Sequence, residues 1–187
     1  NTSSVTGMAS MFQSAVSFDG DVSKFDTPSV TSMAAMFWRA SSFNGDVSNF
    51  DTSSVNDMSW MFNATSFNGT VSNFDTSRVT TMDWMFRDTS SFNQDLSNFD
   101  TSSVRSMDEM FTRATSFNRD VSSFDLSSAK DVDFVFWGAS SFNQDLCSWR
   151  DNFPYTNADD IFTNPSCTYQ DTPNETQKGP FCASNCQ

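Results

Sequence analysis

Histidine is absent from this chain of 187 residues. The Ser-His-Asp and Cys-His arrangements of hydrolytic enzymes therefore cannot form, and neither can a zinc site that mixes cysteine with histidine. The sequence also lacks a Gly-x-Ser-x-Gly segment and a glycine-rich phosphate loop. We therefore expect no catalytic residues and no bound organic cofactor, and we predict that the protein is not an enzyme.

Long hydrophobic runs and basic residues are also scarce. The longest apolar cluster, residues 134–137, falls far short of the roughly 18 residues that a membrane-spanning helix needs, so we expect no membrane insertion. The chain has 10 basic and 23 acidic residues and a formal net charge of −13. This charge repels phosphate backbones, which excludes nucleic acid as a partner. It favours cations and basic proteins without selecting between them.

Cysteine is confined to the C-terminal part of the chain, at Cys147, Cys167, Cys182 and Cys186. The spacing lacks the two close Cys-x-x-Cys knuckles of a four-thiolate zinc site. We therefore predict two disulfides, a secreted or cell-surface protein and an oxidising compartment. Four cysteines allow three pairings. We expect Cys147–Cys167 and Cys182–Cys186, with the first bond tying the last coil to a C-terminal cap.

Leucine and isoleucine are scarce too, whereas phenylalanine occurs 21 times and methionine 10 times. These residues recur with a period of about 25 residues, marked by a Met-Phe pair or its apolar equivalent. The pairs begin at Met11, Met36, Met61, Met85, Met110, Val135 and Ile161. A unit of this length cannot bury its own hydrophobic face, so neighbouring units must stack around a shared core.

Each repeat carries signals for one short helix and one short strand. Residues 30–37 place apolar side chains at helical spacing, and Thr27 followed by Pro28 is typical of a helix start. Residues 43–50 open on an Asn-Gly turn and continue as an extended segment. These patterns predict an α/β repeat solenoid with a Phe and Met core. We expect the solenoid over residues 1–150 and a disulfide-stapled cap over 151–187. Because residue 1 falls inside a repeat, we expect the chain to be a fragment of a longer protein.

The repeats resemble those of the BspA-like leucine-rich-repeat surface proteins. Residues 92–104 (FNQDLSNFDTSSV) and 107–111 (MDEMF) carry this resemblance, which recurs in register over about residues 1–150. The family usually has Trp where this chain has Phe25, Phe50, Phe74, Phe99 and Phe124, and Trp149 alone keeps it. The cysteine-containing tail is similar to the ending of secreted algal members. The resemblance implies a leucine-rich-repeat-like, right-handed coil at the cell surface, with adhesion as a function.

Two columns of aspartates invite a cation-binding interpretation. The first column follows the core Phe residues and comprises Asp26, Asp51, Asp75, Asp100 and Asp125. The second comprises Asp21, Asp46, Asp95, Asp120 and Asp145, with Thr70 interrupting it. Calcium prefers several oxygen ligands, and calcium is therefore the one bound ion that the sequence suggests. In the alternative interpretation, each carboxylate accepts hydrogen bonds from nearby backbone N–H groups.

Three further features bear on function. An Asn column, with members such as Asn44 and Asn93, is interpreted as a structural ladder. Asn-x-Ser/Thr sequons at Asn1, Asn63, Asn68 and Asn174 indicate N-glycosylation in a eukaryotic source. Around the Met-Phe pairs, five side chains differ from repeat to repeat and form a candidate interaction face. They are Trp38, Arg39, Trp60, Trp84 and Arg87.

The variation of this face favours an extracellular interaction or adhesion module. Its partner would be a protein or a component of the matrix or cell wall. The alternative is a structural subunit of an extracellular filament, cell wall or larger assembly that self-associates and is stabilised by cations. Uniform columns would favour this second interpretation, since any regularly stacked repeat produces them.

Overall fold

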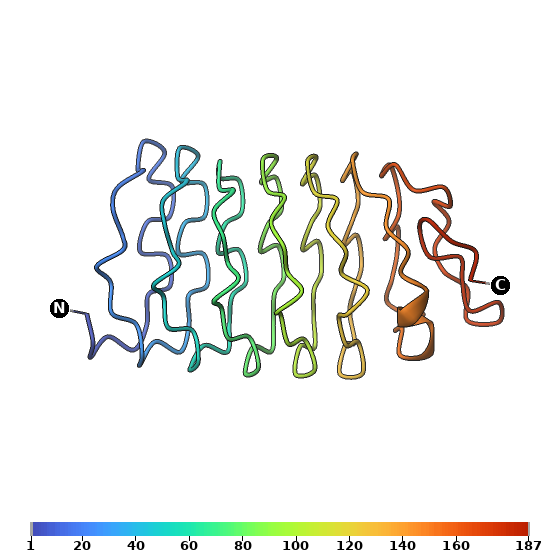
Figure 1. The fold of residues 1–187 in the computed structure, drawn as a ribbon, viewed down its shortest axis with the longest axis horizontal. Coiled ribbons are helices and arrows are strands. Elements are labelled where there is room, and N and C mark those ends of the chain that lie inside the picture. Colours follow the sequence, from blue (N-terminus) through green and yellow to red (C-terminus); the bar gives the residue numbers. More distant parts are fainter. Residues whose placement is uncertain (1, 187) are drawn as a thin grey trace.

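A computed structural model describes residues 2–186. The chain winds into a row of coils that lie side by side, with the two termini at opposite ends of the row (Figure 1). Isolated parallel bridges join each coil to the next. They connect Gly7 to Ser32, Ser32 to Asp57, Asp57 to Thr81, Thr81 to Ser106 and Ser106 to Asp131. The repeat of the sequence is therefore the coil of the structure.

The prediction of one helix and one strand per repeat is wrong. Among the described residues the only helix is a 3-10 helix, η1, at Cys147–Asp151, and the parallel pairing is limited to single bridges. Thr27 does not cap a helix. Its buried hydroxyl donates to the carbonyl of Asp51 in the next coil (3.0 Å) and accepts from the backbone N–H of the same residue (2.8 Å). The coils are instead built from turns and linked by polar groups.

Tight turns over residues 33–40 form a ribbon where a helix was expected over residues 30–37. The N–H groups of Met36 and Ala40 bond back three residues within the coil, whereas those of Met33, Ala35 and Phe37 donate to carbonyls of the next coil. This alternation requires a positive φ at Ala35 (55°) and at the residue four positions later. Such a conformation costs a non-glycine residue roughly 1–2 kcal/mol. The bonds between coils offset that cost.

Phenylalanine and methionine fill the core, as predicted. Phe86 is fully buried and stacks on Phe92 of its own coil, with ring centroids 3.9 Å apart. It also stacks on Phe62 and Phe111 of the neighbouring coils, at 5.7 Å each. The pattern repeats in every coil from Phe37 to Phe136. Each stacked pair adds about 0.5–1.5 kcal/mol beyond burial, so the rings form a continuous spine.

An asparagine ladder runs along the outside, and its predicted structural role is confirmed. The side-chain carbonyl of Asn44 accepts from the backbone N–H of Asn68 (2.8 Å). In the same way, the side-chain carbonyl of Asn68 accepts from the backbone N–H of Asn93, and that of Asn93 accepts from the backbone N–H of Asn118. Residues 43–50, expected as a strand, are thus held to the next coil by a side-chain amide. A row of backbone bonds is not needed there.

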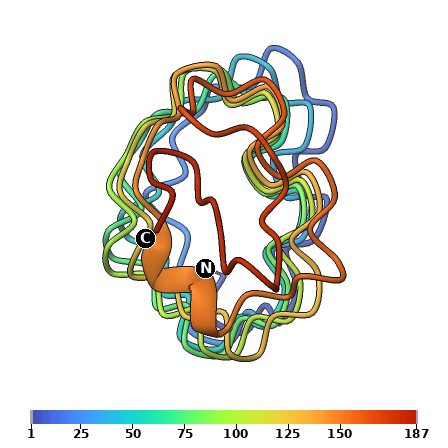
Figure 2. The ribbon, with the colours of Figure 1, turned by 90° about the vertical axis from the view of Figure 1, so that its right-hand side faces the viewer.

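The C-terminal tail folds across the open end of the coils (Figure 2). Backbone hydrogen bonds between coils continue as far as the bond that Gly138 N–H donates to Thr163 O. The tail begins after it. An antiparallel bridge between Asp145 and Cys182 brings the end of the tail back to the last full repeat.

This return path sets the disulfides and contradicts the expected pairing of Cys147–Cys167 and Cys182–Cys186. Cys147 bonds to Cys186 and Cys167 bonds to Cys182, with Cα separations of 5.4 and 4.6 Å. The first bond joins the start of η1 to the end of the tail. The second closes a loop within the cap.

No helix of residues 2–186 has both the length and the apolar composition that crossing a membrane would require.

Candidate functional site

Seven outward side chains of the turn ribbons form what we call the tryptophan–arginine strip. It consists of Trp38, Arg39, Trp60, Trp84, Arg87, Arg113 and Trp137. The turn geometry places them there, because Trp60 and Trp84 occupy one positive-φ position of the repeat and Arg39 and Arg113 occupy the other. Inward positions of the same turns hold the core methionines and phenylalanines.

Indole rings of three successive coils touch one another in the strip. Trp60 and Trp84 are stacked, with centroids 4.2 Å apart and an interplanar angle of 13°. Trp38 meets Trp60 edge to face at 5.0 Å. All three side chains are partly exposed. The structure therefore brings together the three tryptophans that the sequence singled out.

Arginine guanidinium groups lie over these rings. Arg39 covers Trp38 at 4.8 Å, Arg87 covers Trp84 at 4.0 Å, and a third pair forms between Arg113 and Trp137 at 4.7 Å. Such cation–π contacts contribute about 0.5–1 kcal/mol at exposed sites. They also fix the guanidinium planes, so that the N–H groups are presented in set directions.

Carboxylates pair with two of the arginines. Arg87 contacts Glu109 at 2.7 Å and Asp88 at 3.3 Å, and Arg113 approaches Asp88 at 3.7 Å. Burial raises the pKa of Glu109, and the guanidinium of Arg87 opposes that rise. Donors and acceptors thus lie beside one another in the part of the strip between Arg87 and Arg113.

Two shallow cavities open along the strip and share Arg87. The first, of about 210 Å³, is lined by Trp38, Trp60 and Trp84 together with polar neighbours. The second, of about 220 Å³, is lined by Glu109, Arg113, Phe134 and Trp137. Because they share a lining residue, the two cavities are neighbours on the same face of the coils.

A third column of acidic residues borders the strip, at Asp83, Asp108, Asp133 and Asp159. One oxygen of Asp83 accepts from the backbone N–H of Asp108 in the next coil (3.0 Å), and Asp108 accepts from the indole N–H of Trp84 (3.1 Å). Burial raises the pKa of Asp108 to about 6, with Asp131, Glu109 and Asp83 adding to the rise. Burial also raises the pKa of Asp133.

The two predicted aspartate columns do not gather into a cation site. All carboxylates of the first column except Asp26 accept from the serine two residues later, as Asp51 does from Ser53 N–H (3.0 Å) and Ser53 Oγ (2.6 Å). These bonds lower the pKa of Asp75 and Asp100. Members of the second column do the same, and the serine bonds lower the pKa of Asp21, Asp46 and Asp95. The hydrogen-bonding interpretation therefore fits both columns.

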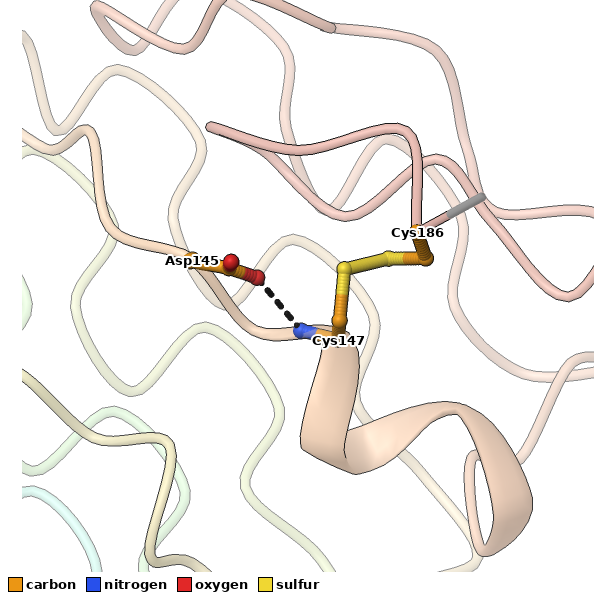
Figure 3. A group of neighbouring side chains, drawn as sticks. All are labelled: Asp145, Cys147 and Cys186. Atoms are coloured by element: carbon orange, nitrogen blue, oxygen red, sulfur yellow. Dashed lines mark hydrogen bonds between the residues drawn. A yellow bond between two sulfur atoms is a disulfide. The ribbon is translucent and has the colours of Figure 1, made fainter.

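One cluster of potential metal ligands exists among residues 2–186, formed by Asp145, Cys147 and Cys186 (Figure 3). Its two sulfur atoms are joined in a disulfide, and the carboxylate accepts from the backbone N–H of Cys147 at 2.9 Å. A disulfide offers no thiolate, and thiolate is the form in which cysteine binds metal. This group therefore anchors the cap.

The predicted sequons differ in their surroundings. Asn63 is 4% exposed and donates to the carbonyl of Trp84 at 3.4 Å, so a glycan does not fit there in this conformation. Asn68 is exposed within the asparagine ladder, and Asn174 is exposed in the tail. Asn1 lies outside the described residues.

Sequence reasoning missed two of the seven strip residues, Arg113 and Trp137, and it also missed Phe134 and Glu109 beside them. Arg113 and Trp137 occupy the repeat positions of Arg39 and Trp38, and Phe134 and Glu109 occupy that of Trp84. The repeat register was therefore the signal that could have found them. The bordering Asp83, Asp108 and Asp133 column was visible in the same register.

Comparison with known proteins places the chain in a family without assigning it an activity. Searches of curated proteins and of solved structures found no match. A family described as "Mycoplasma protein of unknown function, DUF285" matches two overlapping stretches, residues 1–74 and 63–174. These stretches together cover most of the chain, and the protein belongs to this family.

Proposed function

We propose that the protein is an extracellular recognition or adhesion module that binds another macromolecule through the tryptophan–arginine strip. The observation that carries this proposal is the strip itself. Tryptophan and arginine are the side chains most enriched where binding energy concentrates in interfaces. In this molecule they lie together on one face, around two shallow cavities that share Arg87. The partner is a protein or a component of the matrix or cell wall.

Two further observations support an extracellular setting. Both cysteine pairs form disulfides, and these bonds persist in oxidising compartments. The repeats also resemble those of BspA-like surface proteins, in which adhesion is a recurrent function. The family match covers the same region of repeats.

Binding to native extracellular material tests the proposal. Labelled protein is incubated with intact cells or isolated matrix of the producing organism, and bound protein is measured. We expect the double variant Trp60→Ala/Trp84→Ala to bind at least fivefold less than wild type, while Arg78→Ala, at an exposed position away from the strip, binds normally. Circular dichroism confirms that each variant is folded. Equal binding by wild type and both variants would contradict the proposal.

The alternative function, a structural subunit, is supported by the first coil. Met11 and Val16 are 43% and 59% exposed there, and they are the most exposed large apolar side chains of the described residues. Exposed apolar surface of this kind favours association. Sedimentation velocity over a wide concentration range tests it. Concentration-dependent growth into long assemblies that Met11→Ser/Val16→Ser abolishes would favour the structural role.

A further inference from the structure

The geometry points to a neutral, linear polysaccharide as the ligand of the tryptophan–arginine strip, an inference that rests on the function proposed above. The shape, the polar groups and the charge of the strip each bear on it.

The strip has the dimensions of an extended chain. Trp38 and Trp137 lie four repeats apart, which at about 4.8 Å per coil gives a length of roughly 19 Å. Both cavities lie on this line and share Arg87. Each coil from Trp38 to Trp137 presents an aromatic ring or a guanidinium group, so the surface suits a polymer whose own units repeat at a comparable distance. A compact small molecule would fill one cavity and leave the other unused.

The polar groups match hydroxyls. Arg87 presents N–H donors directly beside the acceptor oxygens of Asp88 and Glu109. A hydroxyl group donates one hydrogen bond and accepts two, so neighbouring hydroxyls of a sugar ring can each use a donor and an acceptor of this set. The partly exposed rings of Trp137 and Phe134 line the same cavity. They offer apolar surface to the C–H groups of the sugar.

The charge favours a neutral ligand. Asp88 already lies near both Arg87 and Arg113, and Glu109 pairs with Arg87. The bordering acidic column and the net charge of −13 repel anionic polymers. A neutral polysaccharide avoids this repulsion and the desolvation of a further charge.

A peptide fits this surface less well. The N–H groups of Trp84, Phe86 and Asp88 all donate to the next coil, so the strip has no free strand edge to which an extended peptide could add. The cavities are also shallow, whereas peptide side chains bind tightly through enclosed pockets.

Calorimetry with neutral oligosaccharides tests the inference. The probes are linear hexasaccharides of β-1,4-glucan, β-1,3-glucan, β-1,4-mannan and β-1,4-xylan, with the matching disaccharides. We expect at least one hexasaccharide to bind, its disaccharide to bind at least tenfold more weakly, and Trp84→Ala to raise the Kd at least tenfold. Arg78→Ala should leave the Kd unchanged. Trp84→Phe, which keeps a ring, should restore most of the affinity and guards against a folding defect.

Three results would overturn the inference: no hexasaccharide binds, a hexasaccharide binds equally well to Trp84→Ala, or only sulfated or uronic polymers bind. A second experiment, on extracellular material, distinguishes failure of this inference from failure of the proposed function. If binding to extracellular material depends on Trp60 and Trp84 but survives enzymatic removal of neutral polysaccharide, the strip recognises something else and the recognition function stands. If binding never depends on the strip, both proposals fail.

Discussion

Single residues in this structure adopt a backbone conformation that most side chains avoid. Ala35 has a φ of 55°, and the corresponding position is occupied by tryptophan, glutamate, phenylalanine or aspartate in later coils. At the second positive-φ position a glycine, Gly138, does occur, with a φ of 69°. Glycine adopts this region without steric cost. The other coils therefore hold strained residues in place through their bonds to neighbouring coils.

Replacing Ala35 by glycine tests this view of the turns. We expect Ala35→Gly to increase the free energy of unfolding by about 0.5–1 kcal/mol, because relief of the left-handed strain exceeds the extra entropy of the unfolded chain. Ala34→Gly, next to it and without a positive φ, should decrease it by about 0.5–1 kcal/mol. Urea denaturation of both variants measures the difference. Two decreases of equal size would contradict the argument.

The carboxyl of Asp108 gives the stability a pH dependence. Its pKa is about 6 in the folded protein and near 3.8 when unperturbed. Between these values the folded state binds more protons than the unfolded state, so stability rises as the pH falls from 7 towards 4. We expect about 1 kcal/mol from this group, after allowance for partial solvent screening, or roughly 2–4 °C in Tm.

Thermal melts at pH 7 and pH 5 check this expectation, with Asp108→Asn as the matched variant. The amide still accepts from the indole of Trp84 but does not titrate, so the variant should show a smaller rise in Tm than wild type. Glu109 and Asp133, whose pKa values burial also raises, supply the remainder. Below about pH 3.8 stability should fall again, because serine bonds lower the pKa of Asp75 and Asp100. A wild-type Tm that is equal at pH 7 and pH 5 would rule out this role of Asp108.

At the scale of the structural element, the ring spine is the main source of cohesion. Phe86 is fully buried and stacks on rings in its own and both neighbouring coils. We expect Phe86→Ala to reduce the free energy of unfolding by about 3–5 kcal/mol. Phe12→Ala, in the first coil and only partly buried, should cost less than half as much. Chemical denaturation followed by tryptophan fluorescence measures the free energy of unfolding of both variants. Equal losses of stability would contradict the prediction that Phe12 contributes less than Phe86.

The same element shows what the sequence could and could not predict. Spacing of apolar residues identifies which side chains face the core, and Met33, Met36 and Phe37 are indeed fully buried. It does not identify the partners of the backbone N–H groups. Here those of Met33 and Phe37 donate to the next coil. A ribbon of turns and a short helix thus share one apolar pattern, and the helix prediction failed for that reason.

The candidate site was predictable to the extent that it follows the repeat. Outward positions around the Met-Phe pairs identified Trp38, Trp60 and Trp84, which lie together in the structure. The tail carries no repeat, so its path and its disulfides could not be derived from register. Cys186 returns to Cys147 because the tail pairs with Asp145, and no local pattern in the sequence encodes that pairing.

For the whole molecule, stability should vary along the row of coils. A coil of this kind contacts only its neighbours. Among residues 2–186 the first coil contacts another coil on one side, whereas the last is covered by a cap with two disulfides (Figure 1). We therefore expect amide hydrogens of residues 8–14 to exchange at least tenfold faster than those of residues 82–88. Hydrogen exchange with mass spectrometry measures this, and reduction of the disulfides should speed exchange at the C-terminal end. Uniform exchange along the chain would contradict it.

The direction of the bonds between coils has a consequence for the whole molecule. In each neighbouring pair, four N–H groups of the turn ribbon point from the earlier coil to carbonyls of the later one, as from Trp84 to Asp108, and few backbone bonds such as Thr31 N–H to Thr6 O run the other way. Aligned peptide dipoles add. The row of coils should therefore carry an electric dipole along its axis, negative towards the N-terminus. Its sense is opposite to that of an α-helix, so the positive pole of the backbone lies at the capped end.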